Sequence, residues 1–168
     1  MSHLEVMHVY KNILVPVDGS KTSLSGLNEA IKVAKSQGGQ LRLVHIVNEF
    51  VFDYSYSPGL YANELIESLR NAGQKTLDAM AAIVRQQGLQ ADCVLLESIG
   101  GPAADLIVAQ AKQWPADLIV MGTHGRRGLR RLALGSDAEE VLRSAPVPVL
   151  LVRGEPAAAA GKHAQSAR

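Results

Sequence analysis

The sequence predicts a single α/β domain, in which an open sheet of five parallel strands carries helices on both faces. Short apolar runs alternate with longer segments of helical periodicity along most of the chain, as in parallel α/β folds. Most of these runs are apolar at nearly every position, which is typical of strands buried on both faces. With 168 residues, of which 47% are hydrophobic, the chain is long enough to bury one such core.

The first half of the chain predicts two strands and two helices. Ser20 follows the first apolar run and can cap a helix, and Gly38 stands where the helical pattern of that segment stops. Gly88 ends a second, longer helical pattern in the same way. We therefore expect a strand over residues 13–17, a helix after Ser20, a strand over residues 41–47 and a helix over residues 62–87.

The second half predicts three strands and two helices. Pro102 lies near the first position of a helix, where the missing N–H of proline does no harm. Pro146 and Pro148 flank the last apolar run, which favours the edge of the sheet for that strand. We expect strands over residues 91–98, 117–121 and 147–152, and helices after Pro102 and over residues 136–144.

The remaining residues indicate a simple organisation. Residues 1–10 are interpreted as an N-terminal extension, residues 11–153 as the domain, and the alanine-rich residues 154–168 as a disordered tail. Cys93 is the only cysteine, which excludes an intramolecular disulfide, and its apolar surroundings predict a buried, unreactive thiol. The chain has no signal-peptide or membrane-spanning pattern, so we expect a cytoplasmic protein without a membrane partner.

Glycines follow the strand predicted over residues 117–121 and lead to the start of a helix. Gly122 and Gly125 are followed, after nine residues, by Gly135 and Ser136. Such a segment can bind phosphate, because glycines admit a ligand close to the backbone and the first N–H groups of a helix have no partner within it. In this spacing the chain resembles the universal stress protein family, whose nucleotide-binding members carry glycine, two residues, glycine, nine residues, then Gly-Ser or Gly-Thr. The resemblance covers most of the chain.

The resemblance implies a Rossmann-like sheet with strand order 3-2-1-4-5. It also implies an adenine nucleotide (ATP, ADP or AMP, with or without Mg²⁺) in the crevice at the carboxyl ends of the strands. A homodimer is implied as well, formed by antiparallel pairing of the strand over residues 147–152 with its copy. The residues expected at the nucleotide are Pro16, Asp18, Ile46, Met121, Gly122, Gly125, Gly135, Ser136 and Asp137.

The resemblance also assigns roles within this set. Asp18 is expected to contact the ribose or the adenine side, and the backbone of Ile46 to meet the adenine. Met121 and Gly122 are expected to line the ribose side. The phosphates are expected to lie on backbone N–H groups and one hydroxyl, supplied by Gly125, Gly135 and Ser136.

The start of the last helix departs from the family pattern. Ser136 and Glu139 have the spacing of a capping box, in which the two side chains close the first helical turn reciprocally. At Asp137 and Ala138, nucleotide-binding members usually carry a small apolar or hydroxyl residue. The Asp137 carboxylate stands where a triphosphate needs amides and hydroxyls, so it disfavours ATP more than a nucleotide with fewer phosphates.

Two clusters and two histidines leave alternatives open. The segment over residues 48–61 holds five of the seven aromatic residues, and is either a lid over the base or a loop packed on the long helix. His45 is expected in the core or the crevice, and His124 in a loop. A basic cluster is either a solvated face or a source of charge for phosphates; its members are Arg126, Arg127, Arg130 and Arg131.

Composition and absent motifs narrow the function. A net charge of +1, with no aromatic residues beside the arginines, argues against a nucleic-acid partner. The sequence has no Gly-x-x-x-x-Gly-Lys, no Gly-x-Gly-x-x-Gly after the first strand and no zinc-ligand spacing. Together with these exclusions, the resemblance implies a stress-response module that binds a nucleotide, with no catalytic or metal-binding residues. The alternatives are a dimeric interaction module with a degenerate pocket and a slow ATPase.

Overall fold

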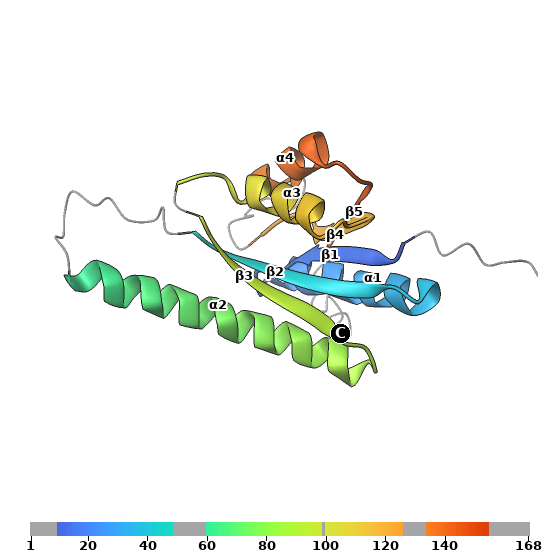
Figure 1. Cartoon of the computed structure of the whole chain (residues 1–168), viewed down its shortest axis with the longest axis horizontal. Coiled ribbons are helices and arrows are strands. Elements are labelled where there is room, and N and C mark those ends of the chain that lie inside the picture. Colours follow the sequence, from blue (N-terminus) through green and yellow to red (C-terminus); the bar gives the residue numbers. More distant parts are fainter. Residues whose placement is uncertain (1–9, 49–59, 99, 126–133, 155–168) are drawn as a thin grey trace, which may run out of the picture.

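The computed structural model describes residues 10–48, 60–98, 100–125 and 134–154. Within these ranges five parallel strands form one sheet in the order β3-β2-β1-β4-β5, which confirms the predicted fold and strand order (Figure 1). The strands are β1 (Asn12–Pro16), β2 (Gln40–Asn48), β3 (Ala91–Ser98), β4 (Leu118–Gly122) and β5 (Val149–Val152).

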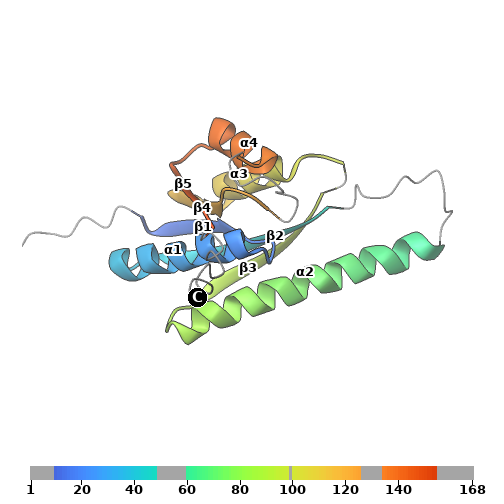
Figure 2. The same cartoon turned by 180° about the vertical axis from the view of Figure 1, so that it is seen from behind.

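The helices of the described residues cover both faces of the sheet. Figure 1 shows α3 and α4 on one face and α1 and α2 on the other, and Figure 2 shows the same layers from behind. The helices are α1 (Lys21–Gln37), α2 (Leu60–Gln86), α3 (Ala103–Gln113) and α4 (Ser136–Ser144). The helix expected over residues 62–87 therefore begins two residues earlier and ends one residue earlier.

The sheet separates two apolar cores. Val15 and Val120 pack on the side of α1 and α2, whereas Leu14 and Ile119 pack on the side of α3 and α4; all four are fully buried. Successive side chains of a strand point to opposite faces, so a strand covered on both faces must be apolar throughout. This explains the continuous apolar runs of the sequence.

The predicted helix ends of α1 and α2 are confirmed. Ser20 is the N-cap of α1, and its hydroxyl oxygen accepts a hydrogen bond from the Ser23 N–H at 3.1 Å. Gly38 ends the same helix in the left-handed conformation, with φ of 62°, and its N–H donates to the Ala34 carbonyl. Gly88 follows α2 with φ of 76°. Glycine adopts these positive φ values without the steric cost that a β-carbon would bring.

The last strand lies at the sheet edge, as its prolines predicted, but it is shorter than expected. It begins at Val149 and not at residue 147. Pro146 and Pro148 carry no N–H and so cannot donate to a ladder. The carbonyl of Pro148 can still accept, and it does so from the Ile119 N–H at 3.0 Å.

The prediction of a buried Cys93 is wrong. Cys93 is exposed and lies on β3, the other edge of the sheet. The apolar run around it is real, but an edge strand has a neighbouring strand on one side only, and Asp92 beside it is exposed as well. Partial burial and the carboxylates of Asp92 and Asp78 nevertheless raise the pKa of the Cys93 thiol, and Arg85 opposes them.

Several expectations lie outside the described residues. They are the disordered tail, all but the ends of the aromatic segment, and the four arginines of the basic cluster. None of the described helices combines the length and the hydropathy that a membrane span requires.

Candidate functional site

The strand register brings three of the expected site residues to one end of the sheet. Pro16 is the last residue of β1 and pairs with Val44 of β2. Ile46 is two residues after Val44 in β2, so in this register it lies beside the turn that follows β1. Ile46 packs against the same core as Met121, near the end of β4. The carboxyl ends of β1, β2 and β4 therefore meet where parallel α/β folds bind ligands.

The turn after β1 holds the Asp18 carboxylate in a defined place. The Ser20 N–H donates to Asp18 Oδ1 at 2.9 Å, and the Asp18 N–H donates to the Ser23 hydroxyl oxygen at 3.1 Å. Together with the Ser20 cap, these bonds join the turn to the first turn of α1. The sequence anticipated Ser20 in this turn but not Ser23, which is buried despite being polar.

Gly125 lies directly against the Asp18 carboxylate. A β-carbon added to Gly125 would lie 2.8 Å from Asp18 Oδ2, well inside contact distance. The glycine segment after β4 and the turn after β1 are therefore in contact. Gly125 is not among the glycines with positive φ, so an alanine at this position would be accommodated by a shift of the Asp18 carboxylate.

Gly122 has a different reason to be glycine. A β-carbon at Gly122 would lie 2.9 Å from both the carbonyl carbon and the carbonyl oxygen of Thr22 in α1. The missing side chain therefore allows a helix to pack on the strand, on the face opposite to the Met121 side chain. The sequence pattern does not distinguish this packing role from ligand approach.

The N-terminus of α4 is fastened to the glycine segment by one backbone bond. The Gly135 N–H donates to the Thr123 carbonyl at 2.9 Å, and the Thr123 N–H donates to the Val152 carbonyl of β5 at 2.9 Å. A β-carbon at Gly135 would come within 3.3 Å of the Thr123 oxygen. The first turn of α4, the glycine segment and the end of β5 are thus held together.

The predicted capping box at Ser136 and Glu139 does not form. Gly135 is the N-cap, Ser136 is already the first helical residue, and no side chain caps this helix. A capping box needs its glutamate at the third helical position, and with Gly135 as the cap that position is held by Ala138 and not by Glu139. Glu139 instead accepts a hydrogen bond from Arg143 at 3.0 Å.

Comparison with known proteins decides the family. The model of the universal stress protein family matches residues 9–153. The chain belongs to this family. A universal stress protein of Methanocaldococcus jannaschii is 37% identical over 147 residues, which are 87% of this chain and 84% of the relative.

Solved structures share the universal stress protein fold. UspA from Lactobacillus plantarum is 27% identical with a TM-score of 0.74, and the match covers 86% of this chain and 98% of that chain. A universal stress protein from Archaeoglobus fulgidus in complex with dAMP is 26% identical with a TM-score of 0.60, with coverage of 86% and 98%. That relative binds an adenine nucleotide with one phosphate.

Two histidines of this universal stress protein lie beside the turns that follow β1 and β4. His45 is buried, and its Nδ1 donates to the Val17 carbonyl at 2.7 Å, which supports the turn one residue before Asp18. His124 lies within the glycine segment, with Nδ1 at 2.9 Å from the Thr123 hydroxyl. Its Nε2 is buried and has no hydrogen-bond partner in the part of the chain that the structure describes.

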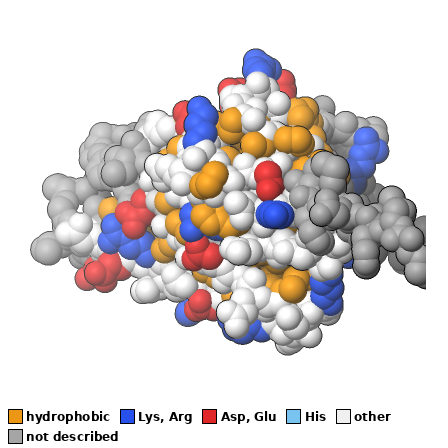
Figure 3. Space-filling model, turned by 45° about the vertical axis from the view of Figure 1, so that its right-hand side comes forward, with side chains coloured by type: hydrophobic (Ala, Val, Ile, Leu, Met, Phe, Trp, Pro, Cys, Tyr) orange, Lys and Arg blue, Asp and Glu red, His pale blue; other side chains and the backbone are white. Residues whose placement is uncertain are grey.

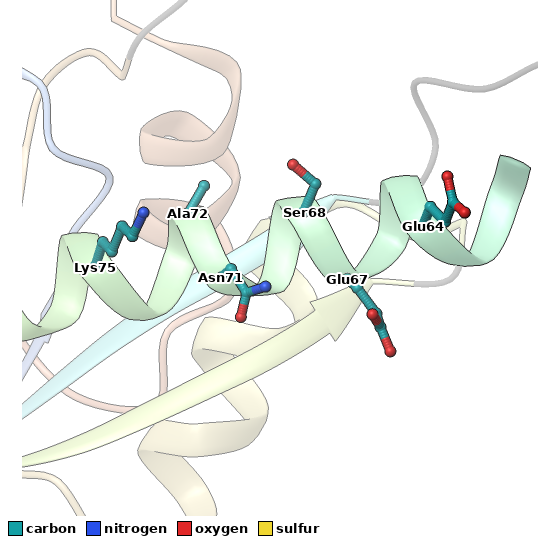
Figure 4. Close-up of a pocket in the computed structure, with 6 residues that line it drawn as sticks. All are labelled: Glu64, Glu67, Ser68, Asn71, Ala72 and Lys75. Atoms are coloured by element: carbon teal, nitrogen blue, oxygen red, sulfur yellow. The ribbon is translucent and has the colours of Figure 1, made fainter.

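A second hollow lies away from this crevice, on the outer surface of α2. It has a volume of about 430 Å³ and is lined by residues of that helix alone (Figure 4). They are Glu64, Glu67, Ser68, Asn71, Ala72 and Lys75. The hollow contains none of the residues expected at the nucleotide.

Charges of both signs are mixed on one face of the described residues. On the face shown in Figure 3, Lys and Arg side chains are interspersed with Asp and Glu side chains. Among the described residues, His, Cys, Asp and Glu form no group of three or more that could hold a metal ion.

Proposed function

We propose that this universal stress protein binds an adenine nucleotide between the Asp18 turn and the segment from Gly122 to Ser136, and acts as a stress-response regulatory module. The observation that carries the proposal is the close approach of Gly125 to Asp18. It joins the glycine motif to the acidic residue that the resemblance assigns to the ribose or the adenine side.

The positions of the other expected residues support the same crevice. Pro16, Ile46 and Met121 lie at one end of the sheet, where the base and the ribose would sit. Ser136 is exposed at the first position of α4, where the first helical N–H groups have no partner within the helix and can receive a phosphate. The dAMP complex of the Archaeoglobus fulgidus relative supports an adenine base as the ligand.

We also propose that the protein is a cytoplasmic homodimer in which β5 pairs antiparallel with its copy. This strand is an edge of the sheet and ends beside the glycine segment. Leu150 is 37% exposed on it. An apolar edge strand that is left open invites uncontrolled pairing, and a closed dimer removes that hazard.

Calorimetry with AMP, ADP and ATP tests the binding function directly. The sharpest variant is Gly125→Ala, because its methyl group displaces the Asp18 carboxylate and touches no backbone atom outside its own neighbourhood. Gly101→Ala is the matched control, since a β-carbon there meets nothing within 4 Å. We expect Gly125→Ala to weaken nucleotide binding at least about tenfold, or about 1.4 kcal/mol, and Gly101→Ala to leave it unchanged.

The result that overturns the proposal is a wild-type protein that binds none of the three nucleotides at millimolar concentration. Mass spectrometry of the purified protein gives an independent answer, since a bound nucleotide that survives purification is identified by its mass. If both experiments find no nucleotide, the protein is an interaction module with an empty pocket. Turnover of ATP in the calorimeter cell, detected as released phosphate, would instead favour a slow ATPase.

A further inference from the structure

We propose that His45 is a positioning residue of the nucleotide site: its imidazole fixes the backbone of Val17, and through it the turn that carries Asp18. The inference rests on the proposed nucleotide site and concerns the side where Asp18 would contact the ribose or the adenine. It is carried by a single side chain that joins the end of β2 to the turn after β1.

The backbone of Val17 is bound to β2 through both its N–H and its carbonyl. The N–H donates to the Val44 carbonyl at 2.8 Å, which extends the pairing of β1 with β2 by one residue past the end of β1. The Val17 carbonyl lies 2.7 Å from His45 Nδ1. Because a carbonyl oxygen can only accept, Nδ1 carries the proton in this bond. The next residue is Asp18, whose N–H and carboxylate are bound in turn to the start of α1.

The imidazole of His45 is confined on the side of α2. A β-carbon added to Gly73 of that helix would lie 2.8 Å from His45 Cδ2 and 2.9 Å from Leu95 Cδ1. Glycine therefore lets α2 pack against the edge of the ring, which leaves the ring little room to turn. His45 is 7% exposed and Val17 is 4% exposed, so the hydrogen bond between them is shielded from water.

Loss of this donor would act on Asp18. A buried carbonyl without a hydrogen-bond partner is costly, so the Val17 carbonyl would move to find another donor. Since Asp18 is the next residue, that movement rotates its backbone and displaces its carboxylate, which lies against Gly125. The side chain of Ile46, beside His45 in β2, packs on the opposite face of the sheet. His45 therefore acts on the site through the Asp18 turn and not by contact with the nucleotide.

The test is a matched pair of substitutions, His45→Leu and His45→Asn, with binding of AMP, ADP and ATP measured by calorimetry. Leucine and asparagine have nearly the same shape, but only asparagine carries a donor nitrogen at the place of Nδ1. We expect His45→Leu to weaken binding about tenfold, because a buried acceptor loses its donor. His45→Asn should bind within about twofold of the wild type.

Stability is measured beside affinity, because His45 also belongs to the buried part of the protein. The asparagine oxygen enters apolar surroundings, so His45→Asn should melt at a lower temperature than the wild type while it retains affinity. Val84→Ala is the matched control, since Val84 is fully buried in the same core as Val17 and lies in the last turn of α2. It should also melt earlier, with unchanged affinity. Circular dichroism melts give the stability of each variant.

The three nucleotides provide a further readout. Asp18 would meet the part that AMP, ADP and ATP share, so His45→Leu should weaken by the same factor each nucleotide that the wild type binds. A loss confined to ATP would mean that the substitution acts on the phosphates, and it would overturn the inference.

The remaining outcomes separate this inference from the proposed function. If His45→Leu binds as tightly as the wild type, or if His45→Asn loses as much affinity as His45→Leu, the imidazole does not position Asp18 and the nucleotide site stands. An equal loss of affinity in Val84→Ala would also overturn the inference, because the effect would then follow stability alone. If the wild type binds no nucleotide at all, the proposed function itself fails.

Discussion

Gly26 of α1 packs directly against the backbone of Gly122 in β4. A β-carbon on Gly26 would lie 3.1 Å from the Gly122 amide nitrogen, and one on Gly122 would lie 2.9 Å from the Thr22 carbonyl of α1. Two glycines therefore let a helix rest directly on the backbone of a strand. The first glycine of the nucleotide motif is consequently a packing residue whatever the crevice binds.

We expect Gly122→Ala to lower the free energy of unfolding by about 1–3 kcal/mol, because backbone atoms cannot move aside as side-chain ends can. Urea unfolding followed by fluorescence of Trp114, the only tryptophan, measures the loss. Trp114 is a suitable probe because the Arg42 guanidinium lies 4.7 Å from its ring centroid in the fold. Gly101→Ala is the control, and equal stability of the two variants would contradict the packing role.

The Ser20 cap should contribute measurably to stability. Ser20→Ala removes the acceptor of the Ser23 N–H and should destabilise the protein by about 1 kcal/mol. Ser25→Ala is matched to it, because Ser25 is inside the same helix and its hydroxyl bonds only the Lys21 carbonyl. Since alanine is the better helix former, we expect that control to be neutral or slightly stabilising. Thermal melts measure the stability of both variants, and a Ser20→Ala protein as stable as the Ser25→Ala protein would contradict a stabilising role of the cap.

The raised pKa of Cys93 should slow its alkylation. At a pH near 8 the thiol should react with iodoacetamide more slowly than a cysteine in an unfolded peptide, because less of it is thiolate. Asp78→Asn removes one of the carboxylates that raise the pKa, so its rate-against-pH curve should move to lower pH. The asparagine oxygen can still accept from Gln74, so the surface of α2 is preserved. An unmoved curve would mean that Asp78 does not act on the thiol, which leaves burial and Asp92 to raise its pKa.

The proposed dimer makes a prediction that uses both edges of the sheet. Leu150→Lys places a charge on β5 and should convert a dimer to a monomer in light scattering. Cys93→Lys places the same charge on the opposite edge strand, β3, and should leave the dimer intact. If Cys93→Lys dissociates the dimer and Leu150→Lys does not, the dimer forms through β3 and the proposed β5 interface is wrong.

Most of the elements could be predicted from the sequence because their causes are local. Ser20, Gly38 and Gly88 end or begin helices through bonds and backbone angles within a few residues of themselves. The capping box was wrong because the cap of α4 is Gly135 and not Ser136, which leaves Glu139 one position too far along the helix. Cys93 was misjudged because an apolar run does not reveal whether its strand is central or at an edge.

The candidate site also combines features that the sequence predicts locally with contacts that depend on the tertiary structure. Periodicity, glycine spacing and prolines determined by themselves that a parallel α/β sheet ends in a glycine segment before a helix, since each signal depends on neighbours in the chain. Only the tertiary structure decided that Gly125 meets Asp18, that Gly122 serves α1, and that Asp137 stands exposed at the helix start. Those contacts join residues far apart in the sequence, and they exist only once the order of the strands has brought the turns after β1 and β4 together.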